Sequence, residues 1–266
     1  MRRAALLTAL AVLAVAAPAR AQSTATITMS GSVVTQALVA DLAYFYRHDV
    51  AGAPRFSLTG GASATGIADA ARGVTDAGMV ARNLIPGDPP GLVMTRLARS
   101  GVCLVTNRAN PVPGITRAQI QDIVAGRVTS WSQIPGSRRS DAIVPVGLDP
   151  TTGSGQVFLA TFVDLATPTV YRPVTLASET QVRDYVAQTP GAFGYVDLEL
   201  AAPLHTLAYN GVGCTRATIA AGTYPAARPL GVVTRGRPRG ALARFLRWAR
   251  TSRKARAVIA RRFLPR

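Results

Sequence analysis

The sequence is poor in the residues that build metal and nucleophile sites. Its 266 residues include only two cysteines and two histidines, all widely separated. A zinc site needs clustered ligands, so we expect no metal and no other cofactor. His48 and His205 are interpreted as surface or hydrogen-bonded core residues, and Gly153-Ser154-Gly155 lacks the G-x-S-x-G spacing of a hydrolase nucleophile. The carboxylates show no acid/base spacing either, so we do not expect an enzyme.

Acidic residues are also scarce. Only 13 Asp and Glu stand against 30 Lys and Arg, which gives a formal net charge of +17. Such an excess favours anionic partners. Much of it lies in one predicted helix near the C-terminus, whose other face is apolar, so we interpret it as a solvated face. Aromatic residues do not alternate with the basic ones as base stacking requires, so no nucleic-acid partner is expected. The basic residues of this helix are Arg244, Arg247, Arg250, Arg253, Lys254 and Arg256.

Long apolar runs are absent beyond the first 21 residues. Arg2 and Arg3 precede an uncharged apolar stretch at 4–17, and Ala19-Arg20-Ala21 fits a cleavage site. We therefore expect residues 1–21 to be a signal peptide, with no nearby cysteine for a lipid anchor. No later segment reaches the roughly 18 apolar residues of a spanning helix, so the mature chain is not expected to be embedded in a membrane. It would carry +14 and reach the periplasm.

Cys103 and Cys214 are the only cysteines. An oxidising compartment would allow them to pair. Cys103 stands in an apolar run at 101–105, however, and a buried free thiol is an equally good interpretation. The sequence leaves both alternatives open.

Strand and helix patterns alternate along the mature chain. Strands are predicted at 26–29, 56–59, 76–80, 101–107, 143–146, 191–196 and 228–234. Helical spacing is found at 33–47, 64–73, after the capping residue Thr116, and near 181–187. This alternation predicts an α/β protein with mostly parallel sheets. A second unit begins near Asn110-Pro111 with no flexible linker before it, so we expect crossing strands to join the two units.

Two glycine-rich turns stand out because each follows a predicted strand and opens a helix. The first is Gly60-Gly61-Ala62-Ser63-Ala64-Thr65-Gly66, and the second is Thr152-Gly153-Ser154-Gly155. Such turns present backbone N–H groups and a serine hydroxyl to an anion. No lysine follows the first turn as a P-loop requires. Two such helix starts converging from two lobes would form an oxyanion clamp.

Further short motifs accompany the two turns in a fixed order. They are Ser30-Gly31-Ser32, Thr75-Asp76-Ala77-Gly78-Met79-Val80-Ala81-Arg82, Asn107-Arg108-Ala109-Asn110-Pro111, the segment 120–131, the segment 190–196 and the segment 224–230. In this order the motifs resemble the phosphate-binding proteins of ABC importers, of the type 2 periplasmic binding protein class. The resemblance covers almost all of the mature chain. It implies a two-lobed fold, each lobe a mostly parallel sheet flanked by helices, with an anion enclosed by hinge closure. Lobe I would comprise 22–102 plus about 208–266, and lobe II about 103–207.

The resemblance also implies a set of ligand contacts. Hydroxyl and N–H groups would donate to the oxyanion. Asp76 would accept the proton of hydrogen phosphate and so discriminate against sulfate, unless its carboxylate only caps a turn. The implied contacts are Ser32, Val33, Ser63, Asp76, Ser154, Gly155 and Gln156.

Three positions depart from the family pattern. Val33 stands where a hydroxyl is usual, Gln156 stands where a threonine is usual, and residues 140–170 contain no Arg or Lys to pair with phosphate. A charge-assisted hydrogen bond contributes roughly 1.5–3 kcal/mol, so loss of the arginine would weaken binding about ten- to a hundredfold. Arg82 either compensates in the cleft or forms a structural ion pair.

These observations favour a periplasmic binding protein for phosphate or a related oxyanion. It would be a monomer that delivers its ligand to the permease of an ABC transporter. The alternative is an envelope sensor or interaction protein that keeps the fold with a degenerate anion site.

Overall fold

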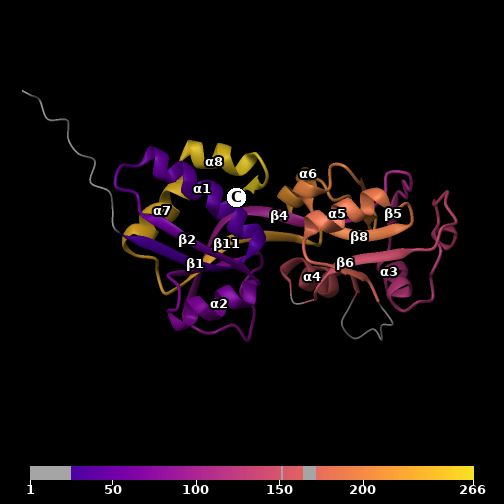
Figure 1. Ribbon diagram of the computed structural model, residues 1–266, viewed down its shortest axis with the longest axis horizontal. Coiled ribbons are helices and arrows are strands. Elements are labelled where there is room, and N and C mark those ends of the chain that lie inside the picture. Colours follow the sequence, from indigo (N-terminus) through magenta and orange to yellow (C-terminus); the bar gives the residue numbers. More distant parts are fainter. Residues whose placement is uncertain (1–24, 151, 164–171) are drawn as a thin grey trace, which may run out of the picture.

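Two lobes lie side by side in the computed structural model, which describes residues 25–150, 152–163 and 172–266. They are joined by two long antiparallel strands, β4 (Leu92–Thr106) and β11 (Ala227–Arg235) (Figure 1). In this pair Arg228 lies opposite Ser100. The predicted signal peptide, 1–21, falls outside the described residues.

One continuous sheet runs through both lobes in the order β2-β1-β3-β11-β4-β8-β6-β7. The first lobe contains the parallel strands β2 (Arg55–Gly61), β1 (Thr26–Ser32) and β3 (Ala77–Val80). The second contains the parallel strands β8 (Ala192–Asp197), β6 (Val144–Leu148) and β7 (Val174–Leu176). The crossing strands between these groups are antiparallel to their neighbours. The predicted two-lobed α/β fold with crossing strands is therefore confirmed.

Four short strands complete the sheets. β9 (His205–Thr206) and β12 (Leu264–Pro265) pair with β4, whereas β5 (Gly114–Ile115) and β10 (Ala208–Tyr209) form a small separate sheet.

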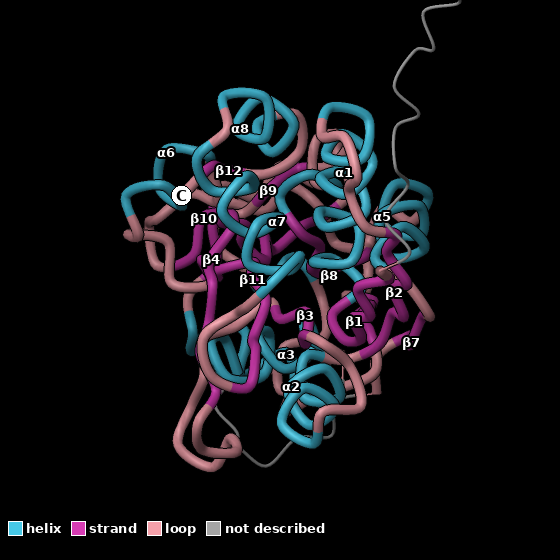
Figure 2. Tube along the Cα trace, turned by 90° about the vertical axis from the view of Figure 1, so that its left-hand side faces the viewer, coloured by secondary structure: helices cyan, strands magenta, loops and turns pink. Residues whose placement is uncertain are grey.

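Helices cover both faces of each lobe. In the first lobe α1 (Val33–Asp49), α7 (Gly240–Thr251) and α8 (Arg253–Ala260) lie on one face and α2 (Ser63–Arg72) on the other (Figures 1 and 2). In the second lobe α5 (Glu179–Gln188) and α6 (Arg216–Ala221) lie above the strands in Figure 1, and α3 (Arg117–Val124) and α4 (Gly153–Phe158) lie below. Short single turns occur at η1 (Trp131–Gln133), η2 (Leu159–Val163) and η3 (Leu198–Leu200).

Each lobe has its own apolar core. The first core combines α1 with α7 and α8, for example Leu42 and Tyr46 against Phe245. The second core lies around Trp131, Phe158 and Phe193. The segment up to Ala226 packs with this second core through residues such as Ile219 and Tyr224. The chain therefore returns to the first core only at β11.

The basic C-terminal segment forms two helices and not the single helix expected from its spacing. The break is at Ser252, which has extended backbone angles (φ −69°, ψ 133°). Its hydroxyl oxygen accepts hydrogen bonds from the N–H groups of Lys254 and Ala255. A serine that caps a new helix offers the backbone an alternative to helix continuation. Arg253, Lys254 and Arg256 consequently belong to α8.

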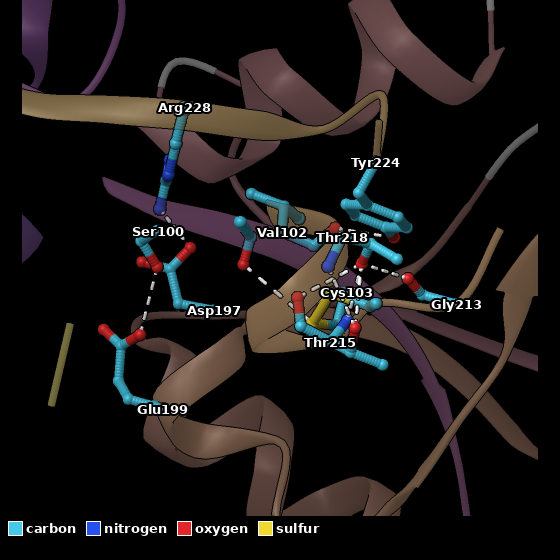
Figure 3. Close-up of a disulfide and its surroundings, with 12 residues drawn as sticks. Ser100, Val102, Cys103, Asp197, Glu199, Gly213, Thr215, Thr218, Tyr224 and Arg228 are labelled. Carbon is cyan, nitrogen blue, oxygen red and sulfur yellow. Dashed lines mark hydrogen bonds and ion pairs between the residues drawn. A yellow bond between two sulfur atoms is a disulfide. The ribbon is translucent and has the colours of Figure 1, made fainter. Parts of the chain in front are cut away.

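Cys103 and Cys214 form a disulfide with Cα atoms 5.5 Å apart. The bond ties the second half of β4 to the residue before Thr215, the N-cap of α6 (Figure 3). The free-thiol alternative is therefore wrong for both cysteines.

Glycines allow α2 to lie unusually close to β3. An added Cβ at Gly78 would lie 2.1 Å from the carbonyl oxygen of Gly66. One at Gly66 would lie 2.5 Å from the oxygen of Ser30. No side chain fits at these separations, so glycine at both positions fixes where α2 begins relative to β1.

Candidate functional site

The first helices of lobe I begin without side-chain caps. Ser32 and Ala62 are the N-caps of α1 and α2, and neither side chain accepts a hydrogen bond from its helix. Both helices start directly after strands β1 and β2, at the carboxyl ends where ligands bind in α/β sheets. In lobe II the helices α3 to α6 are each capped by a side chain, from Thr116, Thr152, Ser178 and Thr215. The N–H groups at the start of α1 and α2 thus remain available to an anion.

A cavity of about 540 Å³ lies beside these two helix starts. Residues of both lobes line it, so it is an interlobe cleft. Lobe I contributes Ser32, Val33, Val34, Ala37, Gly61, Ala62 and Arg262, lobe II contributes Leu148, Thr152, Gly153, Ser154, Ala177, Ser178, Glu179, Thr180, Glu199 and Leu200, and Arg228 comes from the crossing strand β11.

Arg228 places a buried cation at this cleft. Only 4% of the residue is exposed. Its Nη2 donates to the Ser154 hydroxyl at 2.9 Å and to the Asp197 carboxylate, and it lies 3.8 Å from Oε1 of Glu179. Its Nη1 and Nε are buried and make no hydrogen bond within the described chain. Buried polar groups are normally hydrogen-bonded. Two buried N–H donor atoms without an acceptor therefore indicate a place where a ligand can accept hydrogen bonds.

Three carboxyl groups lie near the guanidinium: Asp197 and Glu199, which Figure 3 shows, and Glu179. Burial raises the pKa of Asp197 well above its usual range, although the charge of Arg228 opposes this shift. Burial likewise raises the pKa of Glu199, whose Oε2 accepts a hydrogen bond from Ser100 at 3.1 Å. Glu179 accepts from the Ser154 hydroxyl and, at 2.8 Å, from the backbone N–H of Asp197. These contacts hold Nη2 of Arg228 in place, while burial favours the protonated forms of Asp197 and Glu199.

The two lobes approach each other next to Arg228. The Ser63 hydroxyl at the start of α2 accepts a hydrogen bond from the N–H of Ala81 at 3.1 Å, which leaves its own proton for a ligand. A Cβ built on Gly153 would lie 3.7 Å from Nη1 of Arg228 and 3.9 Å from Oγ of Ser63. The unpaired Nη1 and the Ser63 hydroxyl therefore lie close to each other beside Gly153, although Ser63 is buried and is not among the described residues that line the cleft.

The residues expected to bind the ligand occupy different positions relative to the cleft. Ser32, Val33 and Ser154 line the cleft. The Ser154 hydroxyl donates to Glu179 and accepts from Arg228, so it has no proton left for an anion. The N–H of Gly155 donates to the Thr152 side chain at 3.1 Å, and that of Gln156 to the Thr152 carbonyl at 2.9 Å. The N–H groups of the third and fourth residues of α4 are thus satisfied within the turn.

Asp76 and Arg82 lie outside the set of described residues that line the cleft. Asp76 precedes β3, and its Oδ2 accepts from the N–H and hydroxyl of Thr28 at 2.8 and 2.9 Å. Arg82 forms a two-pronged ion pair with Asp88, both contacts 2.8 Å, which lowers the pKa of Asp88. These contacts fit the turn and ion-pair alternatives that the sequence left open.

Arg228 is the functional candidate that sequence reasoning missed. Residues 140–170, next to the second glycine turn, contain no Arg or Lys, and Arg82, the cation that the sequence offered instead, pairs with Asp88. The Arg228 side chain comes from a strand 74 residues after Ser154 in the chain. The only available signal was an arginine at the start of an otherwise apolar predicted strand. The described residues contain no cluster of His, Cys, Asp and Glu suited to a metal ion.

Comparison with known proteins agrees with this architecture. The phosphate-binding protein PstS of Bacillus subtilis is 24% identical over 243 residues, covering 90% of this chain and 79% of that protein. An ABC-type phosphate transport receptor from Vibrio cholerae superposes with a TM-score of 0.74 at 24% identity, covering 90% and 99% of the two chains. A Clostridium perfringens protein solved with bound phosphate gives a TM-score of 0.76 at 23% identity, covering 91% and 99%. The family model of the PBP superfamily domain (PBP-like 2) matches residues 16–253, so the chain belongs to the PBP superfamily.

Proposed function

We propose that this protein captures phosphate or a related oxyanion between its lobes and delivers it to the permease of an ABC transporter. The observation that carries the proposal is the buried Arg228, whose Nη1 and Nε have no partner in the described chain. The proposed ligand set is Arg228, Ser63, Ser32 and the first N–H groups of α1 and α2. The relatives named as phosphate-binding proteins and phosphate transport receptors support the same reading.

The charge balance of the site fits a small oxyanion. The guanidinium and two uncapped helix starts supply positive potential, and P–O⁻ groups accept such donors strongly. The degenerate-site alternative was motivated by Val33, the strong basic charge and a missing arginine, and Arg228 answers the last of these. A location of the protein outside the cytoplasmic membrane is also consistent with the structure. The described residues include no helix long and apolar enough to cross a membrane, and the disulfide suits an oxidising compartment. We propose that the protein acts in the periplasm as a monomeric receptor without catalytic activity.

Calorimetry on residues 22–266 tests the proposal. Phosphate should bind with a stoichiometry of one. Ser63→Ala should weaken binding about tenfold, because one hydroxyl donor is lost. Arg228→Gln should weaken it more, because the only cation in the proposed ligand set is removed. Arg235→Gln is the matched control, since Arg235 lies on the same strand but is exposed.

Two results would contradict the proposal. One is the absence of heat with phosphate, sulfate, molybdate and an organic phosphate alike. The other is unchanged phosphate affinity in both Ser63→Ala and Arg228→Gln, with far-ultraviolet circular dichroism showing that both variants are folded.

A further inference from the structure

The cleft has an apolar wall as well as an anion-binding end. Val33, Val34 and Ala37 of α1 face it from lobe I, and Leu148, Ala177 and Leu200 line it from lobe II. Its volume of about 540 Å³ falls in the range of pockets that hold small organic molecules. A tetrahedral oxyanion displaces on the order of two or three waters of roughly 30 Å³ each. An inorganic anion alone therefore leaves most of the cleft unfilled.

Val33 is an exposed large apolar residue of this wall. Its relative exposure is 63%, which is high for a large apolar side chain, and it immediately follows the N-cap of α1. One of its methyl carbons would lie only 2.9 Å from a Cβ placed on Gly60, so Val33 stands over the end of β2. An isopropyl group at this point neither donates nor accepts a hydrogen bond. It can interact favourably only with an apolar part of a ligand.

The distribution of hydrogen-bond donors around the cleft also favours a ligand with an apolar part. Inorganic phosphate carries four oxygens, each of which needs a polar partner once it leaves water. The donors with free capacity are those of Arg228, Ser63 and Ser32 and the first N–H groups of α1 and α2. On the remaining sides the ligand would meet the Val33 side chain or the carboxyl groups of Glu179 and Glu199. A phosphoryl group with one oxygen replaced by or esterified to carbon would avoid leaving an oxygen against this wall.

We propose that the preferred ligand is a phosphoryl group carrying a short alkyl substituent, with the phosphoryl oxygens on Arg228 and Ser63 and the substituent on Val33. This inference rests on the proposed function, because it assumes that the anion binds at Arg228. The two sources of such a group are phosphonates, with a P–C bond, and phosphate monoesters, with a P–O–C bond.

A calorimetric series tests the inference with inorganic phosphate, methylphosphonate, ethylphosphonate, propylphosphonate and ethyl phosphate. Each buried methylene should strengthen binding roughly fourfold until the wall is covered. Ethylphosphonate should thus bind at least several-fold more tightly than inorganic phosphate. The ratio of ethylphosphonate to ethyl phosphate affinity separates the two sources.

Val33→Ser is the diagnostic variant. It should abolish the gain per methylene, measured for each protein relative to its own affinity for inorganic phosphate. Val74→Ser is the matched control, because Val74 is 64% exposed and lies outside the cleft lining, and it should behave as the unmodified protein.

The outcomes separate this inference from the proposed function. If phosphate binds and every alkyl form binds more weakly, the inference is overturned and the proposed function stands. If Val33→Ser lowers phosphate and alkylphosphonate affinity equally, the apolar contact is also refuted. If none of the five compounds binds, both fail. Tighter binding of the alkyl forms that depends on Val33 supports the inference.

Discussion

Asp76 and Ala81 stand on either side of β3 (Ala77–Val80), and only the second is in contact with the proposed ligand residues. Ligands of α/β sheets bind beyond the carboxyl ends of the parallel strands. A residue that follows a strand is therefore a better site candidate than one that precedes it. The motif around β3 is recognisable in the sequence, but its Asp76 precedes the strand and lies outside the described cleft lining.

Asp76→Asn should leave the selectivity between phosphate and sulfate unchanged. The Asp76 carboxylate already accepts two hydrogen bonds from Thr28 and lies outside the cleft lining. The expected effect is on stability, about 1 kcal/mol, the usual contribution of such hydrogen bonds. Competition calorimetry with both anions measures selectivity, and urea unfolding measures stability. Relaxed discrimination against sulfate would return Asp76 to the ligand set.

Glu199→Gln should remove part of the pH dependence of stability. Burial raises the pKa of Glu199 above its ordinary value of 4.5. Below pH 4.5 the group is protonated in both the folded and unfolded states. As the pH rises towards the folded-state pKa, the unfolded chain releases its proton first, so the free energy of unfolding of the unmodified protein falls.

The glutamine variant should therefore gain stability over the unmodified protein as the pH rises, by about 1.4 kcal/mol for each unit of pKa shift. Its amide oxygen can still accept the hydrogen bond from Ser100. Urea unfolding at pH 4.5 and pH 8 measures the difference. Parallel pH profiles for the two proteins would contradict it.

Local sequence predicted one helix start correctly and missed one helix end. The predicted cap at Thr116 is confirmed, and the structure adds that it forms a capping box with Gln119. The break at Ser252 was missed, because apolar periodicity continues on both sides of it. Apolar residues such as Leu242 and Ile259 are buried in the same core on both sides. Periodicity reports burial, whereas the serine cap decides where each helix ends.

The glycine at position 78 should be irreplaceable for the packing of α2. A Cβ there would lie 2.1 Å from the Gly66 carbonyl oxygen, a backbone atom that cannot rotate away. Gly78→Ala should therefore lower the free energy of unfolding by about 3 kcal/mol or more, the upper end of overpacking effects. It should also weaken phosphate binding, because it displaces the start of α2.

Gly213→Ala is the control for this substitution. A Cβ at Gly213 would lie 3.6 Å from its nearest neighbour, an ordinary contact. Its stability should stay within about 0.5 kcal/mol of the unmodified protein. A Gly78→Ala variant of equal stability would mean that α2 and β3 can separate without loss.

The whole molecule brings together residues that no local pattern connects. Ser63, Ser154 and Arg228 belong to two lobes and a crossing strand, and their approach depends on the pairing of β4 with β11. The family resemblance predicted that two glycine turns would converge. It did not reveal that β11 would supply the cation, because strand pairing between distant segments has no local sequence signature.

Net charge should act on the rate of ligand capture more than on the strength of binding. Residues 22–266 carry a formal charge of +14, and Arg244, Arg247 and Arg250 project from the exposed side of α7. A positive surface raises the local concentration of anions and speeds association, an effect that salt screens over about 10 Å at 0.1 M.

Reversing these three arginines to glutamate should slow phosphate association several-fold at 10 mM ionic strength and leave the dissociation rate unchanged, because none of the three lines the cleft. The difference from the unmodified protein should disappear near 0.5 M salt, where the screening length is only a few ångströms. Stopped-flow tryptophan fluorescence gives both rates.

Reversal of three exposed arginines elsewhere, Arg108, Arg127 and Arg138, is the matched control and should slow association by a similar factor if net charge alone steers the anion. A larger effect on dissociation than on association would instead mean that the α7 arginines contact the bound ligand.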